Sequence, residues 1–224
     1  LPDSPTNRVS EDSIVGKKEE HEFAALSLAK TKQVSDLVKW AEDRPIWISW
    51  KLDGLTLVVT YDGGKLTKIV TRGNGHIGTN ITHLAPAISG IPATISEKGH
   101  LVVRGEAVIS YADFEQFIIE SEGDYANPRN LASGSLTLKD IDEVKQRHIQ
   151  WIPFTLVYTE REITSWGERM QMLKDLGMNP VERERIDHPT TENIQQEIDK
   201  FTEKVTSKKN PFPVDGLVIC YDDT

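Results

Sequence analysis

The run from Trp47 to Tyr61 is the part of the sequence that most constrains the fold. It is rich in β-branched and aromatic residues and ends at the triplet Asp62-Gly63-Gly64. An apolar run of this kind followed by glycines is typical of a strand that enters a hairpin turn. The sequence therefore predicts one strand over 47–61, a turn at 62–64, and a partner strand over 65–71.

This run contains the tetrapeptide Lys51-Leu52-Asp53-Gly54. Side chains alternate along a strand, so Lys51 and Asp53 would share a face. A lysine beside a carboxylate has two interpretations. It is either an ion pair at a sheet edge or a nucleophilic amine, because desolvation favours the neutral amine and the carboxylate can orient it or take its proton. The tetrapeptide alone leaves both open.

Composition limits the class of protein. A chain of 224 residues can bury a core as one large domain or two small ones. Its net charge of -9 argues against a broad surface for non-specific DNA binding, although Lys145–Arg147 and Lys208-Lys209 are locally basic. The single cysteine, Cys220, excludes an internal disulfide or a cysteine-based zinc site within these residues and agrees with a reducing compartment. No apolar run approaches the ~20 residues that span a bilayer.

The remaining pattern predicts a mixed α+β fold with antiparallel sheets flanked by helices. Residues 1–20 are polar and are interpreted as an extended lead-in, with one domain over 21–224. The small, polar residues of 126–136 are interpreted as a loop. Apolar periodicity predicts helices over 34–42, 111–120, 168–176 and 193–205, and strands over 101–109, 149–158 and 213–220.

Polar groups fall at unusual places in these elements. The segment Arg72–Gly78 contains three glycines and is either a flexible turn or a loop that a ligand approaches closely. Arg104 and Glu106 would share a face of their strand. A buried Glu106 needs a partner, which would be an arginine, a ligand hydroxyl or a metal. Asp215 is expected to be a buried acid, and Cys220 is expected to be core rather than reactive.

Over nearly its whole length the chain resembles the adenylation, or nucleotidyltransferase, domain of bacterial NAD-dependent DNA ligases. Four motifs occur in the family's order: Lys51-x-Asp-Gly54, Thr71-Arg-Gly-Asn-Gly75, Arg104-Gly-Glu106 and Val214-Asp-Gly-Leu-Val-Ile219. The string Ala126-Asn-Pro-Arg-Asn-Leu-Ala-Ser-Gly-Ser-Leu136 is characteristic of the NAD-dependent enzymes.

The resemblance implies a nucleotide cleft between the sheets and a role for each matching residue. Lys51 would attack the AMP phosphorus of NAD, and Asp53 would orient Lys51 or support a metal. Asp215 would also help to hold the metal, and Cys220 stands at a position that contacts the AMP phosphate. The other implied cofactor-binding residues are Ser27, Leu28, Arg72, Glu106, Arg129 and Phe154, the last by stacking on adenine.

The resemblance also implies the cofactors and partners. These are NAD and Mg²⁺, with zinc only in a C-terminal part of the parent protein that lies beyond these residues. Nicked double-stranded DNA would be bound through the full-length, multidomain ligase. Sealing of the nick is not expected from these residues alone. The protein would be a monomer in the bacterial cytoplasm, associated with the nucleoid and not with a membrane.

Several positions depart from the family pattern. Ser49 replaces a glutamate, Asn74 an aspartate, Thr137 an arginine and Cys220 a lysine, and the cationic position before the final Asp-Gly falls near Ser207. Loss of a cation beside the phosphate would weaken transition-state stabilisation. Two alternatives to a working ligase domain therefore stay open: a weakened or inactive nucleotide-binding module, and an ATP-dependent relative.

Overall fold

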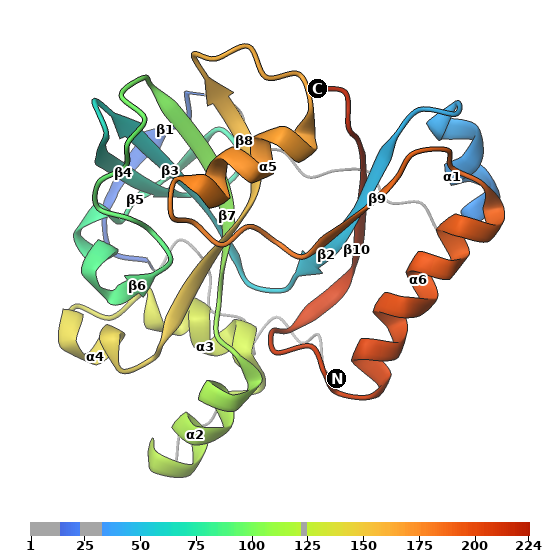
Figure 1. Cartoon of the computed structure of the whole chain (residues 1–224). Helices are drawn as coiled ribbons and strands as arrows, with labels where there is room; N and C mark the ends of the chain where they lie inside the picture. The colour runs from blue at the N-terminus through green and yellow to red at the C-terminus, as the bar shows by residue number, and fades with distance from the viewer. Residues whose placement is uncertain (1–13, 23–32, 122–124) are drawn as a thin grey trace.

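The computed structural model describes residues 14–22, 33–121 and 125–224. Its strands form two sheets that lie side by side in Figure 1. The larger sheet contains, in spatial order, β1 (Lys17–Glu20), β5 (Ile77–Asn80), β4 (Lys65–Thr71), β3 (Leu55–Asp62), β7 (Leu101–Val108), β8 (Ile149–Thr159) and β6 (Ile88–Ser89). The smaller sheet contains β10 (Val214–Tyr221), β2 (Ile46–Leu52) and β9 (Arg183–Ile186). This arrangement confirms the predicted α+β class with antiparallel sheets.

Seven helices accompany the sheets in the described part of the chain. They are α1 (Val34–Ala41), the 3-10 helix η3 (Thr82–Ala87), α2 (Tyr111–Ser121), α3 (Pro128–Ser135), α4 (Ile141–Lys145), α5 (Trp166–Asp175) and α6 (Thr191–Thr206). None of the helices in these ranges is long and apolar enough to cross a membrane.

The prediction of one strand over 47–61 is wrong, because the chain leaves one sheet and enters the other in the middle of this run. β2 belongs to the smaller sheet and β3 to the larger, and Asp53-Gly54 connects them. A Cβ atom on Gly54 would lie only 2.1 Å from the carbonyl oxygen of Ala107, so the crossing requires glycine. The backbone N–H of Asp53 donates to the carbonyl of Pro213 at 2.9 Å. Lys51 therefore lies where the two sheets meet.

The predicted hairpin is confirmed. Asp62 ends β3, and β4 begins at Lys65 and pairs antiparallel with β3. Gly63 and Gly64 have φ values of +58° and +79°, in the left-handed region that glycine adopts without steric cost.

The two faces of the smaller sheet have different surroundings. Ile46, Ile48 and Trp50 alternate on one face and are buried. That face packs on α1 and α6, for example through an edge-on contact between Trp50 and Phe201 with ring centroids 4.7 Å apart. Figure 1 shows both helices on the side of the smaller sheet that is remote from the larger one. The opposite face, which carries Trp47, Ser49 and Lys51, is therefore turned toward α5 and the larger sheet.

The carboxylate of Asp222 ties the far end of the smaller sheet to α5. Its Oδ1 accepts hydrogen bonds from Trp47 Nε1 at 2.7 Å, Ser165 Oγ at 2.8 Å and the backbone N–H of Gly167 at 3.1 Å. Arg185 of β9 lies 3.4 Å from the other oxygen. These donors hold the pKa of Asp222 below its usual value against the opposing effect of burial. One carboxylate thus joins β2, β9, β10 and α5.

The segment 126–136 is not a surface loop. Pro128–Ser135 forms helix α3, and most of its residues are buried. Asn127 caps the helix by accepting a hydrogen bond from the backbone N–H of Asn130 at 2.8 Å, and Pro128 occupies the first turn, where it is tolerated. Small residues allow close packing, since a Cβ on Gly134 would lie 3.0 Å from the ring of Tyr125.

Part of the predicted lead-in forms a strand of the larger sheet. Lys17–Glu20 forms β1, which runs antiparallel to β5, and the amine of Lys68 lies 3.0 Å from the carboxylate of Glu19. The end of the 1–20 segment is therefore attached to the edge of the larger sheet. The division into a lead-in and a domain over 21–224 stays a prediction.

Candidate active site

Lys51 and Asp215 face each other across β2 and β10. Lys51 pairs with Gly216, and the register shifts between Val214 and Gly216, so Asp215 lies in a bulge. Lys51 Nζ is 3.5 Å from Asp215 Oδ2, and the side chains are 37% and 45% exposed. The expectation that Asp215 is buried is wrong, because the bulge turns it to the surface. An exposed ion pair of this kind contributes little stability, and it leaves the amine accessible to a ligand.

Asp53 and Gly54 are held from a second direction by Arg129. Arg129 Nε lies 3.2 Å from Asp53 Oδ1 and donates to the carbonyl of Gly54 at 3.2 Å. Arg129 extends from α3, whose buried small residues fix the helix against the larger sheet. Arg129, which the sequence analysis named only through a family motif, thus lies at the sheet crossing near Lys51.

Glu106 of β7 contacts the same crossing segment. Its Oε2 accepts from the backbone N–H of Gly54 at 3.2 Å, and its Oε1 accepts from Thr56 Oγ1 at 2.8 Å. Burial raises the pKa of Glu106 from 4.5 to about 7, although these two hydrogen bonds and the charge of Arg129 act in the opposite direction. Near neutral pH this carboxyl group can exchange a proton, and it can either accept from or donate to a ligand hydroxyl.

Arg72 and Arg104 lie close enough to affect each other. Burial and the charge of Arg72 lower the pKa of Arg104. The backbone N–H of Arg72 donates to the carbonyl of Thr56 at 3.1 Å, so Arg72 starts its turn beside β3. Arg104 and Glu106 are second neighbours on β7 and share a face, as predicted.

The glycine-rich segment 72–78 is a tight turn with internal hydrogen bonds. Asn74 Oδ1 accepts from the backbone N–H groups of His76 at 2.9 Å and Ile77 at 2.8 Å. A Cβ on Gly73 would lie 2.0 Å from the carbonyl oxygen of Ile77. Only glycine therefore fits at this position of the turn, even without a ligand. Close approach of a ligand to this turn stays a prediction.

Cys220 lies on the Lys51 face of the smaller sheet. It pairs with Trp47, and the side chains of directly opposed antiparallel residues lie on the same face. Burial, with a smaller effect from the charge of Asp222, raises the pKa of the thiol to about 12. The thiol is therefore neutral at physiological pH and unreactive as a nucleophile.

Phe154 is half-buried on β8 and packs against the core. Its neighbour Pro153 accepts a hydrogen bond from the backbone N–H of Val181 at 2.9 Å, just before β9 begins. This bond links β8, the strand that contains Phe154, to the segment that leads into β9 of the smaller sheet. Ser27 and Leu28 lie outside the described residues.

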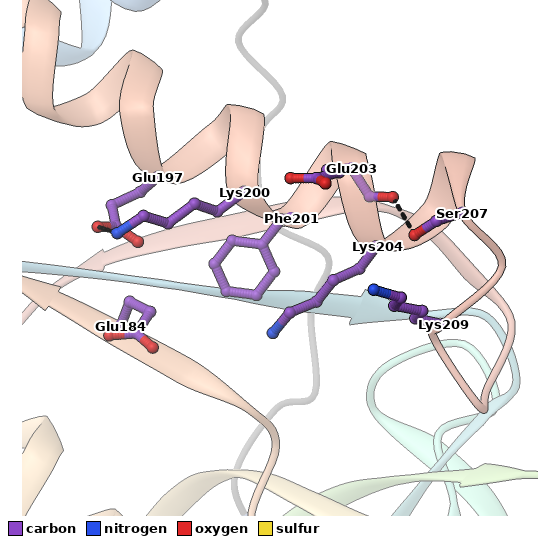
Figure 2. Close-up of a pocket in the computed structure, with 8 residues that line it drawn as sticks. All are labelled: Glu184, Glu197, Lys200, Phe201, Glu203, Lys204, Ser207 and Lys209. Carbon is purple, nitrogen blue, oxygen red and sulfur yellow. Dashed lines mark hydrogen bonds and ion pairs between the residues drawn. The ribbon is translucent and has the colours of Figure 1, made fainter.

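A separate pocket lies away from Lys51, between α6 and β9. It has a volume of about 280 Å³. Figure 2 shows Lys200 and Lys204 extending from α6 and Glu184 below them on β9. Its charged side chains include internal pairs, such as Lys200 with Glu197 at 3.2 Å. Lys51 does not line this pocket and lies instead where β2 ends and the two sheets meet.

A lysine at the junction of two antiparallel sheets, with carboxylates from β7 and β10 and an arginine from a flanking helix, defines a nucleotidyltransferase-type ligase adenylation fold. The comparison with protein families agrees, since the model of the NAD-dependent DNA ligase adenylation domain matches residues 17–224. The chain belongs to the NAD-dependent DNA ligase adenylation domain family.

Curated relatives are similar over the whole chain. A DNA ligase of Lachnoclostridium phytofermentans is 38% identical and covers 100% of this chain, which corresponds to 34% of the relative. A DNA ligase of Leptospira biflexa is 38% identical, covering 98% of this chain and 33% of the relative. The chain thus spans about a third of the length of these relatives. A solved structure named Pmar-Lig_Pre matches 85% of this chain and 41% of its own with a TM-score of 0.51 at 17% identity, which supports the fold alone.

Proposed function

We propose that this domain carries out the adenylation step of an NAD-dependent DNA ligase, with Lys51 as the nucleophile. The neutral amine of Lys51 attacks the AMP phosphorus of NAD. A P–N bond forms, the P–O bond to nicotinamide mononucleotide breaks, and the amine loses its proton. The observation that carries the proposal is the accessible Lys51–Asp215 pair, 3.5 Å apart, at the sheet junction of a chain that belongs to this family.

The neighbouring groups have complementary tasks. Asp215 orients the amine of Lys51 and is placed to accept its proton, because it is the carboxylate 3.5 Å from Nζ. Asp53 and Arg129 fix the backbone beyond the lysine. Glu106 contacts a ribose hydroxyl, since its half-buried side chain lies beside the sheet crossing, where its oxygens also accept from Gly54 and Thr56. Arg72 and Arg129 contact phosphates, and Phe154 stacks on the adenine ring, a contact worth roughly 1–3 kcal/mol.

Mg²⁺ fits this site as a hydrated ion. No group of three or more His, Cys, Asp or Glu side chains in the described ranges could hold a metal. Asp53 and Asp215 are each partly exposed, and Mg²⁺ is commonly bound through one or two carboxylates, substrate phosphates and water. These two residues would hold the ion. When bound, the ion offsets the charge that develops on the transferred phosphoryl group.

The later steps belong to the longer protein. The AMP would pass from Lys51 to the 5′-phosphate of nicked DNA, and the 3′-hydroxyl would then seal the nick. This reaction would serve DNA replication and repair in the bacterial cytoplasm, with nicked DNA bound by the full-length ligase and with no oligomer required.

A second candidate is a module that binds the nucleotide without forming the adduct. The observation that favours it is Cys220, which presents a neutral thiol rather than a cation on the Lys51 face. A transition state that develops negative charge loses stabilisation when a positive group is missing.

Intact-mass spectrometry separates these candidates. The protein is incubated with Mg²⁺ and either NAD or ATP, in parallel with Lys51→Ala and Asp215→Asn. The proposal expects an AMP-sized adduct from NAD that is absent in Lys51→Ala and forms more slowly in Asp215→Asn. Nucleotide binding without an adduct in the wild type would support the binding module. An adduct from ATP alone would support an ATP-dependent relative.

A further inference from the structure

His21 follows β1 directly and contacts the glycine-rich turn over 72–78 in two places. Its ring nitrogen Nε2 lies 2.9 Å from the carbonyl oxygen of Arg72, and its backbone N–H donates to the carbonyl of His76 at 2.6 Å. A carbonyl oxygen can only accept a hydrogen bond, so Nε2 of His21 carries the hydrogen of the first bond. One residue at the edge of the larger sheet (Figure 1) therefore bonds to both arms of the turn.

The backbone of Arg72 is held on both sides. Its N–H donates to the carbonyl of Thr56 at 3.1 Å, and its carbonyl accepts from the backbone N–H of Gly75 at 3.0 Å as well as from His21. The bond from Gly75 lies within the turn, whereas the bond from His21 comes from a residue 51 positions earlier in the chain. The backbone from which the Arg72 side chain extends thus depends on a residue outside its own turn.

Arg72 begins beside the group that surrounds Lys51. Thr56, whose carbonyl holds the N–H of Arg72, donates its hydroxyl to Glu106 at 2.8 Å. The charge of Arg72 contributes to the lowered pKa of Arg104, which lies two residues before Glu106 on the same face of β7. Like charges repel, so a firmly held backbone at Arg72 limits how far its guanidinium can move away from Arg104.

We propose that His21 is a positioning residue for Arg72. Its hydrogen bond to the Arg72 carbonyl fixes the turn so that the guanidinium of Arg72 is directed at the phosphate of a nucleotide bound at Lys51. The inference rests on the proposed function, in which Arg72 contacts a phosphate. His21 acts only through Arg72 and touches no ligand, so loss of its donor weakens the binding of a nucleotide and spares that of a nucleoside.

Isothermal titration calorimetry with AMP and adenosine, which differ only in the phosphate, tests this inference without requiring the chemical step. His21→Leu should weaken AMP binding by about tenfold and leave adenosine binding unchanged. His21→Gln retains an N–H donor and should restore the affinity for AMP. In an Arg72→Ala background, His21→Leu should cause no further loss, because residues that act as one unit are not additive. His188→Leu, at a histidine that is 81% exposed, is the matched control and should change neither Kd.

Hydrogen exchange followed by mass spectrometry measures the order of the turn with no ligand present. The amides of 72–78 should exchange about tenfold faster in His21→Leu than in the wild type, because one hydrogen bond that closes the turn is lost. His21→Gln should restore the wild-type exchange rate. The amides of β7 and β8 should exchange equally in all variants, because His21 makes none of its bonds to these strands.

Three results would overturn the inference. The first is unchanged exchange over 72–78 in His21→Leu. The second is an equal weakening of AMP and adenosine, which would indicate a general structural role. The third is a further loss of AMP affinity when His21→Leu is added to Arg72→Ala, which would show that His21 does not act through Arg72.

The proposed function is judged by a different measurement, the formation of an adduct from NAD. An AMP affinity that depends on His21, without any adduct, would contradict the proposed chemistry and leave the positioning role intact. An adduct together with an AMP affinity that is independent of His21 would contradict the positioning role alone.

Discussion

The backbone N–H of Gly54, three residues after the candidate nucleophile Lys51, donates to the half-buried carboxylate of Glu106 at 3.2 Å. This bond joins the crossing between the sheets to the central strand β7. The hydroxyl of Thr56 also donates to Glu106, so one carboxylate accepts hydrogen bonds from two residues that follow Lys51 closely in the chain.

The raised pKa of Glu106 predicts a pH-dependent stability. Its pKa is about 7 in the folded protein and 4.5 in the unfolded chain. Between these values the folded state binds more protons, so the free energy of unfolding falls as pH rises through this window and levels off above about pH 7. Glu106→Gln should flatten this part of the curve, as measured by urea unfolding from pH 4.5 to 8. Parallel curves for the variant and the wild type would contradict the assignment.

Gly54 should be irreplaceable. The Cβ of Gly54→Ala would lie 2.1 Å from a carbonyl oxygen, which forces the backbone of β7 to move. We expect a loss of about 3 kcal/mol in the free energy of unfolding, measured by chemical denaturation. Gly63→Asn is the control, because no atom lies within 4 Å of that site and asparagine tolerates positive φ. It should cost less than about 1 kcal/mol, and equal losses for the two variants would refute the steric explanation.

Cys220→Lys should accelerate adduct formation. The new ammonium group would lie on the Lys51 face, with Asp222 near enough to affect its charge. A cation there would stabilise developing negative charge, and we expect a rate at least about tenfold higher. Cys220→Met controls for side-chain size without adding charge. Single-turnover mass spectrometry measures both rates, and equal rates would mean that this position does not contact the phosphate.

His100 should stabilise the fold at low pH. Its Nδ1 lies 2.5 Å from Asp62 and its Nε2 2.8 Å from Glu22, and Glu160 accepts from its backbone N–H at 3.1 Å. The bond to Asp62 and, to a lesser extent, that to Glu22 raise the pKa of His100 above 6.5. The stabilisation is fully present below pH 6.5 and is lost as pH rises through the folded pKa.

Thermal unfolding at pH 5.5 and pH 8.5 measures this effect. His100→Asn should reduce the difference in Tm between the two pH values, and Glu22→Gln should reduce it by a smaller amount. A difference that stays the same in both variants would show that His100 is not the titrating group.

The sequence predicted the hairpin at Asp62-Gly63-Gly64 and the strands at 65–71 and 149–158 because their signals are local. The division of 47–61 between two sheets was missed, since both halves have the composition of strands. The Asp-Gly pair at 53–54 was the available signal, because both residue types are depleted in strands. β9 was also missed, since Arg183-Glu-Arg-Ile186 carries little strand propensity and pairs only because β2 offers an edge.

The candidate site was predicted mainly through its motifs. Lys51, Asp215, Glu106 and Arg129 do lie together in the structure. The ion-pair and hydrogen-bond partners of these side chains could not be predicted from the sequence, because the bulge at Asp215 and the buried helix α3 arise from tertiary packing.

The position of the crossing at Asp53-Gly54 has a mechanical consequence for Lys51. The crossing at Asp53-Gly54 is a direct connection between the sheets, whereas β8 and β9 are joined through α5, so a rotation of one sheet about this crossing would have its shortest lever arm there. Lys51 is two residues from that pivot, whereas the Asp222 cluster holds the opposite end of β2. A small tilt of the sheets about this crossing would therefore displace the amine of Lys51 less than the groups farther along β2.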